Sequence, residues 1–484
     1  MRLSSLFFSI LRPFFLSVIY VLLLLTPSAF ADIRVPDAVV TPIAEDAGTK
    51  QHAFVASPLD LAAYDYVEEE FMISGTANTY KKSGRWRSDG EWGIQISQAD
   101  LPYATRLLVR RPANPEKFNG TVVIEWFNNT AFMDVDVIWA QSHQELLREG
   151  YVWIGVSAQT LGVTALKTWD RERYGDLRLN SDGLSYDIFS QVAQAVRRQP
   201  ETVLGGLTAT TVLGVGESQS AIRLTTYVNA FQEPALQVYD GILLYSRFAL
   251  SAPLKNGISM LSPSKVFIRA DNRLKVLQLE TEQDVFMFLF RLARQDDTEY
   301  LRTWEIPGAS HYDDYGVSNL LPQYQRDWPQ LGSIELVCKN SLNKVPQHYV
   351  VNAALSGLAK WASDGQAPAH STRIEYKNLK VSRDANGNAL GGIRLPDLEA
   401  AIATHNYANY GVIGSGNWFV NAFACPFLGN TVPFDQAKLN ALYPTHQDYV
   451  SKFTQAADAA LEAGFLLPAD HKEAIAGAQA ADIP

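Results

Sequence analysis

Residues 212–221 read VLGVGESQSA, an apolar run that meets a Gly-x-Ser-x-Ser turn. A helical pattern follows over residues 222–228, so this part of the chain predicts a strand, a tight turn and a helix. A serine at the tip of such a turn presents its hydroxyl above the carboxyl-terminal edge of a sheet, and its neighbours must be small. Gly216 and Ser220 meet that requirement on either side of Ser218. Ser220 stands where the usual motif has glycine, and serine is also small.

Ser218 has two interpretations. A serine that follows a strand is commonly the N-cap of the next helix, and the Gly-x-Ser-x-small pattern is frequent by chance. The alternative is a catalytic nucleophile. A serine hydroxyl reacts weakly at neutral pH, so this second interpretation requires a base to accept its proton and an acid to orient that base.

Apolar strands alternate with helical segments on both sides of Ser218. Strands are expected over residues 121–127, 151–157, 212–215, 239–245, 276–281 and 300–306, and helices over 134–149, 186–198 and 285–294. This alternation is typical of an α/β fold with a mostly parallel central sheet flanked by helices. Residues 66–75 and 103–112 alternate as half-buried strands do, which predicts an antiparallel N-terminal start to the sheet.

An acid and a histidine follow Ser218 at successive strand ends, where the chemistry of such sheets collects. Asp284 lies in the turn after one predicted strand, and His311 lies just past the next. The α/β-hydrolase fold places its catalytic residues in this order of serine, acid and histidine. Glu282 is the alternative acid, while Glu280 falls within the strand. We therefore predict Ser218, Asp284 and His311 as the catalytic triad.

The oxyanion of such a reaction needs backbone N–H donors. One donor is usually the residue after the nucleophile, here Gln219, and the second comes from the loop after an earlier strand. That loop is residues 128–130, and we expect its donor to be Asn129 or a neighbour. The alternative for this loop is a plain Asx-turn.

The N-terminus has the features of a secretory signal peptide over residues 1–31. Arg2 supplies a positive start, residues 14–25 are an apolar core, and Ala29-Phe30-Ala31 is a small-x-small cleavage site. The alternative is an uncleaved membrane anchor, but Arg12 interrupts the apolar run. We expect a periplasmic or secreted protein with no stable membrane insertion after cleavage.

The mature chain is expected to contain three parts: an N-terminal arm (32–63), a hydrolase core (64–315) and a C-terminal extension packed on that core (316–484). Cys338 and Cys425 both lie in the extension, and in an oxidising compartment such a pair predicts a disulfide. Residues 248–272 and parts of the extension are the expected walls of the substrate pocket.

Several motifs together resemble a family of secreted, largely uncharacterised α/β-hydrolase-domain proteins. They are residues 216–220 with Arg223 and Leu224, and residues 123–128, 279–285, 304–311 and 391–396. The resemblance runs from about Tyr64 to the C-terminus. It implies the α/β-hydrolase fold with Ser218, Asp284 and His311 as the triad, and it implies no substrate.

These features favour an exported serine hydrolase that cleaves a small-molecule carboxylic ester through an acyl-enzyme. The alternatives are amide or lactone hydrolysis, acyl transfer, or a non-catalytic binding protein that uses Trp92, Trp169 and Trp328 in apparent loops. The formal net charge of −10 argues against a nucleic-acid partner. No His-x-x-x-His or Cys-x-x-Cys pair occurs, so neither a metal nor another cofactor is expected.

Overall fold

The computed structural model describes residues 35–256, 264–329, 336–412 and 418–483. The predicted signal peptide, residues 1–31, lies outside these ranges. Within them, the main sheet is formed by β1 (Val39–Ile43), β2 (Tyr66–Ser83), β3 (Gly93–Pro112), β4 (Thr121–Trp126), β5 (Val152–Val156), β6 (Thr211–Glu217), β7 (Gly241–Tyr245), β8 (Lys275–Thr281) and β9 (Leu301–Ile306).

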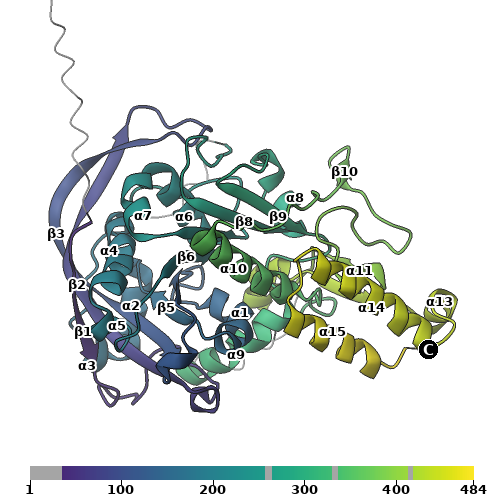
Figure 1. Ribbon diagram of the computed structural model, residues 1–484. Coiled ribbons are helices and arrows are strands. Elements are labelled where there is room, and N and C mark those ends of the chain that lie inside the picture. Colours follow the sequence, from purple (N-terminus) through teal and green to yellow (C-terminus); the bar gives the residue numbers. More distant parts are fainter. Residues whose placement is uncertain (1–34, 257–263, 330–335, 413–417, 484) are drawn as a thin grey trace, which may run out of the picture. The chain divides into compact units, whose positions relative to one another are not determined.

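The strands of this sheet follow the order β1-β2-β3-β5-β4-β6-β7-β8-β9 (Figure 1). Strands β1, β2, β3 and β5 pair antiparallel in that order. From β5 to β9 every neighbouring pair is parallel. The predicted fold class is thus confirmed: a mostly parallel sheet with an antiparallel N-terminal start.

Helices occur between the parallel strands and throughout the C-terminal region. They are α1 (Val137–Arg148), α2 (Thr160–Trp169), α3 (Arg171–Tyr174), α4 (Ser185–Arg198), α5 (Pro200–Val203), α6 (Gln219–Ala230), α7 (Gln232–Val238), α8 (Glu282–Phe286), α9 (Asp314–Asp327), α10 (Gln347–Asp364), α11 (Pro396–Glu399), α12 (Trp418–Ala424), α13 (Gln436–Leu442), α14 (His446–Glu462) and α15 (Pro468–Ala480). Four short strands accompany them: β10 (Tyr376–Lys377), β11 (Lys380–Val381), β12 (Ala403–Asn406) and β13 (Asn430–Pro433).

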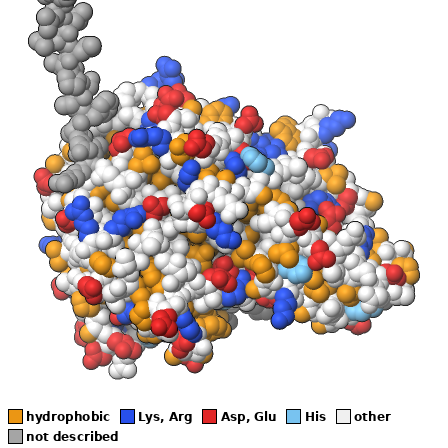
Figure 2. All heavy atoms as spheres, viewed as in Figure 1, with side chains coloured by type: hydrophobic (Ala, Val, Ile, Leu, Met, Phe, Trp, Pro, Cys, Tyr) orange, Lys and Arg blue, Asp and Glu red, His pale blue; other side chains and the backbone are white. Residues whose placement is uncertain are grey.

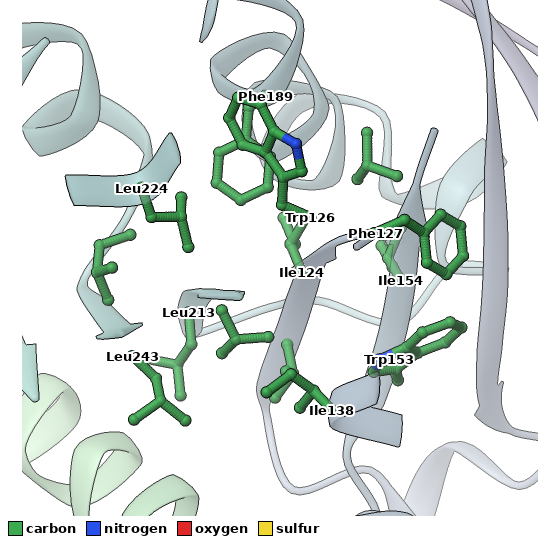
Figure 3. Packing of buried hydrophobic residues seen from close by; sticks show 14 of the residues in the cluster. Ile124, Trp126, Phe127, Ile138, Trp153, Ile154, Phe189, Leu213, Leu224 and Leu243 are labelled. Atoms are coloured by element: carbon green, nitrogen blue, oxygen red, sulfur yellow. The ribbon is translucent and has the colours of Figure 1, made fainter. Parts of the chain in front are cut away.

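The two faces of the sheet are covered by different helices. Glu125 and Trp126 are consecutive in β4, so their side chains point to opposite faces. Glu125 accepts hydrogen bonds from the first turn of α1, at the N–H groups of Ile138 and Trp139. Trp126 instead packs on Phe189 of α4, with ring centroids 5.0 Å apart (Figure 3). Both faces of the parallel strands are therefore buried, which explains their nearly continuous apolar sequences.

The antiparallel start is longer than the sequence predicts. β2 and β3 continue to pair as far as Ser83 and Gly93, well beyond the predicted segments. Many side chains of these outer stretches are exposed, so backbone hydrogen bonds form there without hydrophobic alternation. Strand β1 lies in the segment predicted as an arm, and it pairs with β2 at the edge of the sheet.

One predicted helix is shorter in the structure. Residues 285–294 are expected to be helical, but α8 ends at Phe286 and a separate 3-10 turn spans Phe290–Leu292. Leu289 between them has a φ of 65°, a left-handed conformation that an α-helix does not contain.

Residues beyond 315 complete one face of the sheet. Helix α10 packs against β7 and β8, and α9 and α10 both contact α1. The predicted disulfide is present, with the Cα atoms of Cys338 and Cys425 5.6 Å apart.

On the face shown in Figure 2, side chains of both charge signs are interspersed among hydrophobic ones. Not one helix in the described ranges combines the length and the apolar character needed to cross a bilayer.

Candidate active site

Ser218 stands in the sharp turn between β6 and α6. Its φ of 56° and ψ of −116° are unusual for a residue with a side chain and store strain in the turn. Gly216 makes this turn feasible, since a Cβ there would lie 2.9 Å from the Leu224 side chain. Ser218 occupies the N-cap position of α6, but its side chain makes no capping hydrogen bond. The hydroxyl is therefore available for another partner.

Ser220 closes the same turn. Its hydroxyl accepts a hydrogen bond from the Glu217 N–H at 3.0 Å and donates one to the Glu217 carbonyl at 2.8 Å. Serine in place of the usual glycine is thus more than a small residue: it adds two hydrogen bonds that connect the helix start to the strand end.

The structure brings Ser218, His311 and Asp284 together. Nε2 of His311 lies 2.7 Å from Oγ of Ser218, and its Nδ1 lies 2.5 Å from Oδ1 of Asp284. Ser218 and His311 are only 7% and 4% exposed, and Asp284 is fully buried. In this chain of contacts, a carboxylate orients the imidazole that can accept the serine proton.

Helix α8 fixes the carboxylate of Asp284 independently of His311. Oδ2 of Asp284 accepts hydrogen bonds from the N–H and the hydroxyl of Thr281, while the Thr281 side chain accepts the Asp284 N–H in a reciprocal capping box. Only Oδ1 then faces the imidazole. Asp284 is thereby held in one orientation by its own helix terminus.

Glu282, the alternative acid, points elsewhere. Its carboxylate accepts the Gly308 N–H at 2.7 Å and pairs with Arg383 at 2.5 Å. Among the described contacts of Glu282, none reaches His311. Glu282 instead secures the turn before the histidine, where Gly308 has a φ of 75°.

Gln283 lies between these two acids and connects the histidine loop to the C-terminal region. Its Oε1 accepts the His311 N–H at 2.8 Å, and its Nε2 donates to the Pro426 carbonyl at 2.5 Å. Three successive residues of α8 therefore position His311. The sequence gives no indication of this role for Gln283, since its partner Pro426 is 143 residues away.

Glu217 is a second carboxylate at the imidazole that the sequence reasoning missed, although it lies inside the quoted motif. Its Oε1 is 3.4 Å from Nε2 of His311, and its Oε2 accepts a hydrogen bond from Asn128. Burial is the main reason that the pKa of Glu217 rises to about 8, and His311 opposes this rise. Burial alone lowers the pKa of His311, but Asp284 and Glu217 outweigh it, so the net shift of the His311 pKa is upward.

The two predicted oxyanion donors, Gln219 and Asn129, lie next to each other. The Asn129 N–H donates to Oε1 of the Gln219 side chain at 3.3 Å. Nε2 of Gln219 in turn donates to Gln159 at 2.9 Å. A substrate that used the Asn129 N–H would have to displace the side-chain oxygen Oε1 of Gln219 from it.

The tryptophans considered for a binding surface are mostly packed in the interior. Trp92 is 3% exposed and stacks on Trp86, and Trp169 is 7% exposed. Trp328 is half-buried. Trp92 and Trp169 therefore offer no surface to a carbohydrate or polymer, so their suggested binding role is wrong.

Comparison with protein families agrees with this architecture. A family profile described as an alpha/beta hydrolase domain matches residues 39–476. The chain belongs to this family. The match confirms the fold and the family type that the sequence motifs resemble, and it extends into the C-terminal region. No curated protein matches the chain.

Solved structures with a similar arrangement are distant. They include XC6422 from Xanthomonas campestris, an a/b serine hydrolase without lid (13% identity, 47% of this chain and 89% of that chain, TM-score 0.28). Others are esterase Est22 (12%, 55% and 79%, TM-score 0.31) and a CE15 glucuronoyl esterase from Teredinibacter turnerae T7901 (12%, 60% and 68%, TM-score 0.30). At these identities and TM-scores, the likenesses carry no argument about substrate.

Proposed function

We propose that this protein is an exported serine hydrolase that cleaves a carboxylic ester through an acyl-enzyme. The observation that carries the proposal is the continuous contact from Ser218 through His311 to Asp284, beginning at a strained turn of the α/β-hydrolase fold. This arrangement contains the nucleophile, base and orienting acid that acyl transfer requires.

The reaction has two halves. His311 accepts the Ser218 proton at Nε2 while Oγ attacks the ester carbonyl, and the tetrahedral intermediate collapses as the same proton passes to the departing alcohol oxygen. A water then attacks the acyl-enzyme with His311 again as the base, which releases the carboxylic acid and restores Ser218. Asp284 keeps the Nδ1–H tautomer and stabilises the imidazolium in both halves. The N–H groups of Gln219 and Asn129 are the proposed donors to the oxyanion.

Replacement of the nucleophile tests this proposal. Ser218→Ala should reduce the hydrolysis of a p-nitrophenyl ester panel at least ~10³-fold, because the covalent route is lost. Ser142→Ala is a matched control, since it removes another buried serine hydroxyl, one that donates to the Ile138 carbonyl inside α1. Wild-type activity in a folded Ser218→Ala variant would refute the assignment.

A fluorophosphonate probe distinguishes the enzyme from a non-catalytic binding protein. Such probes react with an activated serine, so the wild type should be labelled at Ser218 and the Ser218→Ala variant should not. Absence of label on folded wild-type protein would favour the binding protein.

Export is the remaining part of the proposal. It is supported by the signal-peptide features of residues 1–31 and by the Cys338–Cys425 disulfide, because such bonds persist in oxidising compartments. Mass spectrometry of the protein from periplasm or medium should find Asp32 as the first residue. Intact residues 1–31 in that material would contradict cleavage.

A further inference from the structure

Three phenylalanine rings surround the imidazole of His311. The ring centroids of Phe288, Phe427 and Phe248 lie 4.8, 5.6 and 5.9 Å from that of His311. The rings also contact one another, at 4.4 Å for Phe248 and Phe288 and 5.6 Å for Phe288 and Phe427. We call these three residues the phenyl wall.

The phenyl wall retains exposed surface beside a histidine that is nearly buried. All three residues are half-buried, whereas His311 is 4% exposed. Phe423 contacts Phe427 at 5.7 Å and is 57% exposed, so it extends the apolar surface outward. Partly exposed aromatic surface at a reacting centre is typical of ligand pockets, because a bound apolar group can remove it from water.

The phenyl wall is assembled from separate parts of the chain. Phe248 follows β7 and Phe288 follows α8, while Phe427 comes from the C-terminal region. The Phe427 carbonyl accepts the Tyr312 N–H at 3.1 Å, directly after His311. Gln283 holds the neighbouring Pro426 carbonyl, and Cys425 is joined to Cys338. The Phe427 backbone is thus fixed to the histidine loop and to α8.

The position of these rings next to His311 places them near the alcohol part of a bound ester. Nε2 of His311 returns a proton to the departing alcohol oxygen, so that oxygen must come within hydrogen-bond distance of Nε2. The acyl carbonyl oxygen points instead toward its N–H donors, the proposed ones being at Gln219 and Asn129. The carbon skeleton of the alcohol therefore begins next to the imidazole and the rings that surround it.

We infer that the substrate is an ester of an apolar alcohol, aromatic or longer alkyl, whose alcohol group packs on Phe248, Phe288 and Phe427. This inference rests on the proposed ester hydrolysis at Ser218 and adds the chemical class of the leaving group. It assigns the specificity for the alcohol to the phenyl wall, of which Phe427 is contributed by residues beyond 315.

Two ester series test the inference. One varies the alcohol at constant acetyl group (methyl, butyl and benzyl acetate), and the other varies the acyl group at constant methanol (methyl acetate, butyrate and phenylacetate). Wild-type kcat/KM should rise by ~10-fold or more from methyl to benzyl acetate, because an apolar group gains a matching surface. Phe427→Ala should lose ~10-fold on benzyl acetate and less than about twofold on methyl acetate.

The variants include a conservative replacement and a distant control. Phe427→Leu should recover part of the benzyl acetate activity, since leucine restores apolar surface without the ring. Phe465→Ala removes a ring that packs on Trp304 and should leave both series unchanged. Should Phe427→Ala fail to fold, Phe288→Leu provides the same comparison of methyl with benzyl acetate.

The outcomes separate this inference from the proposed function. Equal kcat/KM across the alcohol series, or an effect of the variants confined to the acyl series, overturns the inference while Ser218-dependent hydrolysis stands. No turnover of any ester, together with no fluorophosphonate labelling of folded protein, overturns both.

Discussion

The proposed catalytic side chains and the phenyl wall are supported in different ways. Ser218, Asp284 and His311 follow the ends of β6, β8 and β9, whose positions are fixed by parallel pairing across the sheet. Phe427 lies outside the main sheet, at the end of the 3-10 helix Cys425–Phe427. Its position depends on a disulfide, one backbone hydrogen bond and one hydrogen bond donated by the Gln283 side chain. The sheet thus determines where the proposed catalytic residues lie, and the region beyond residue 315 contributes part of what surrounds them.

The largest expected effect comes from a change in the proposed catalytic residues at the end of the sheet. Asp284→Asn should lower kcat about 10⁴-fold, because an amide cannot maintain the Nδ1–H tautomer of His311 or stabilise its cation. Glu282→Gln, two residues away, should change kcat far less and mainly reduce stability, since it weakens the ion pair with Arg383. Kinetics with p-nitrophenyl acetate and thermal unfolding of both variants measure the difference.

An equal or greater loss of kcat in Glu282→Gln would contradict this prediction. It would mean that the direct contact between Asp284 and His311 does not identify the carboxylate that assists the histidine.

The next effect concerns the C-terminal region. The double variant Cys338→Ser/Cys425→Ser opens a loop of 87 residues, so the free energy of unfolding should fall by about 4.6 kcal/mol in the chain-entropy model. None of the described contacts of the proposed triad reaches the disulfide, so hydrolysis of methyl acetate by the remaining folded protein should stay within about tenfold of wild type. Chemical denaturation and steady-state kinetics test the two halves of this statement.

Loss of all ester turnover in a folded double variant would contradict the view that the sheet alone supports the proposed catalytic residues. The extension would then be required for the chemistry itself as well as for its surroundings.

A smaller effect should come from the turn at the nucleophile. Ser220→Gly restores the usual motif but removes both hydrogen bonds to Glu217. Two lost hydrogen bonds and a glycine in the first turn of α6 should together cost about 2 kcal/mol of stability. Denaturant unfolding would show this cost, and a variant as stable as the wild type would show that the two bonds contribute nothing net.

The smallest expected effect is a shift of the pH profile. Glu217 raises the pKa of His311, and His311 must be neutral to act as the base. Activity therefore rises with pH through the His311 pKa. Glu217→Gln removes one of the carboxylates that raise this pKa. Because the raised pKa of Glu217 leaves only part of its carboxylate ionised on the acidic limb, the limb of kcat/KM should move to lower pH by well under one unit. An unchanged limb, or a shift to higher pH, would exclude this influence of Glu217.

The parallel strands, and the residues that meet at their carboxyl ends, could largely be predicted from the sequence. Parallel strands between helices have long apolar runs, and their carboxyl ends share one edge, so residues after successive strands are expected to meet there. The choice between Asp284 and Glu282 also has a local signal, because Thr281-x-x-Asp284 is a capping-box pattern that directs one carboxylate oxygen to the helix start.

The surroundings of the site could be predicted only in outline. The sequence predicts residues 248–272 and parts of the extension as pocket walls, and residues 257–263 of that segment lie outside the described ranges. Phe248 and Phe427 belong to the described parts of these segments. Nothing local distinguishes these two rings from other phenylalanines, because their positions depend on contacts with residues far away in the sequence. Strand β1 also depends on contacts that are distant in the sequence. Val39–Ile43 has no clear hydrophobic alternation, and it forms a strand by pairing with β2.

Helix α8 is only five residues long, yet its residues bind the imidazole, the turn before it and the backbone next to Phe427. All five residues of α8 are buried, and the helix packs on β8 and β9. Loosening of α8 would remove all three contacts at once and would disturb the adjoining strands as well, so on heating the proposed ester hydrolysis and the circular-dichroism signal of the fold should be lost together.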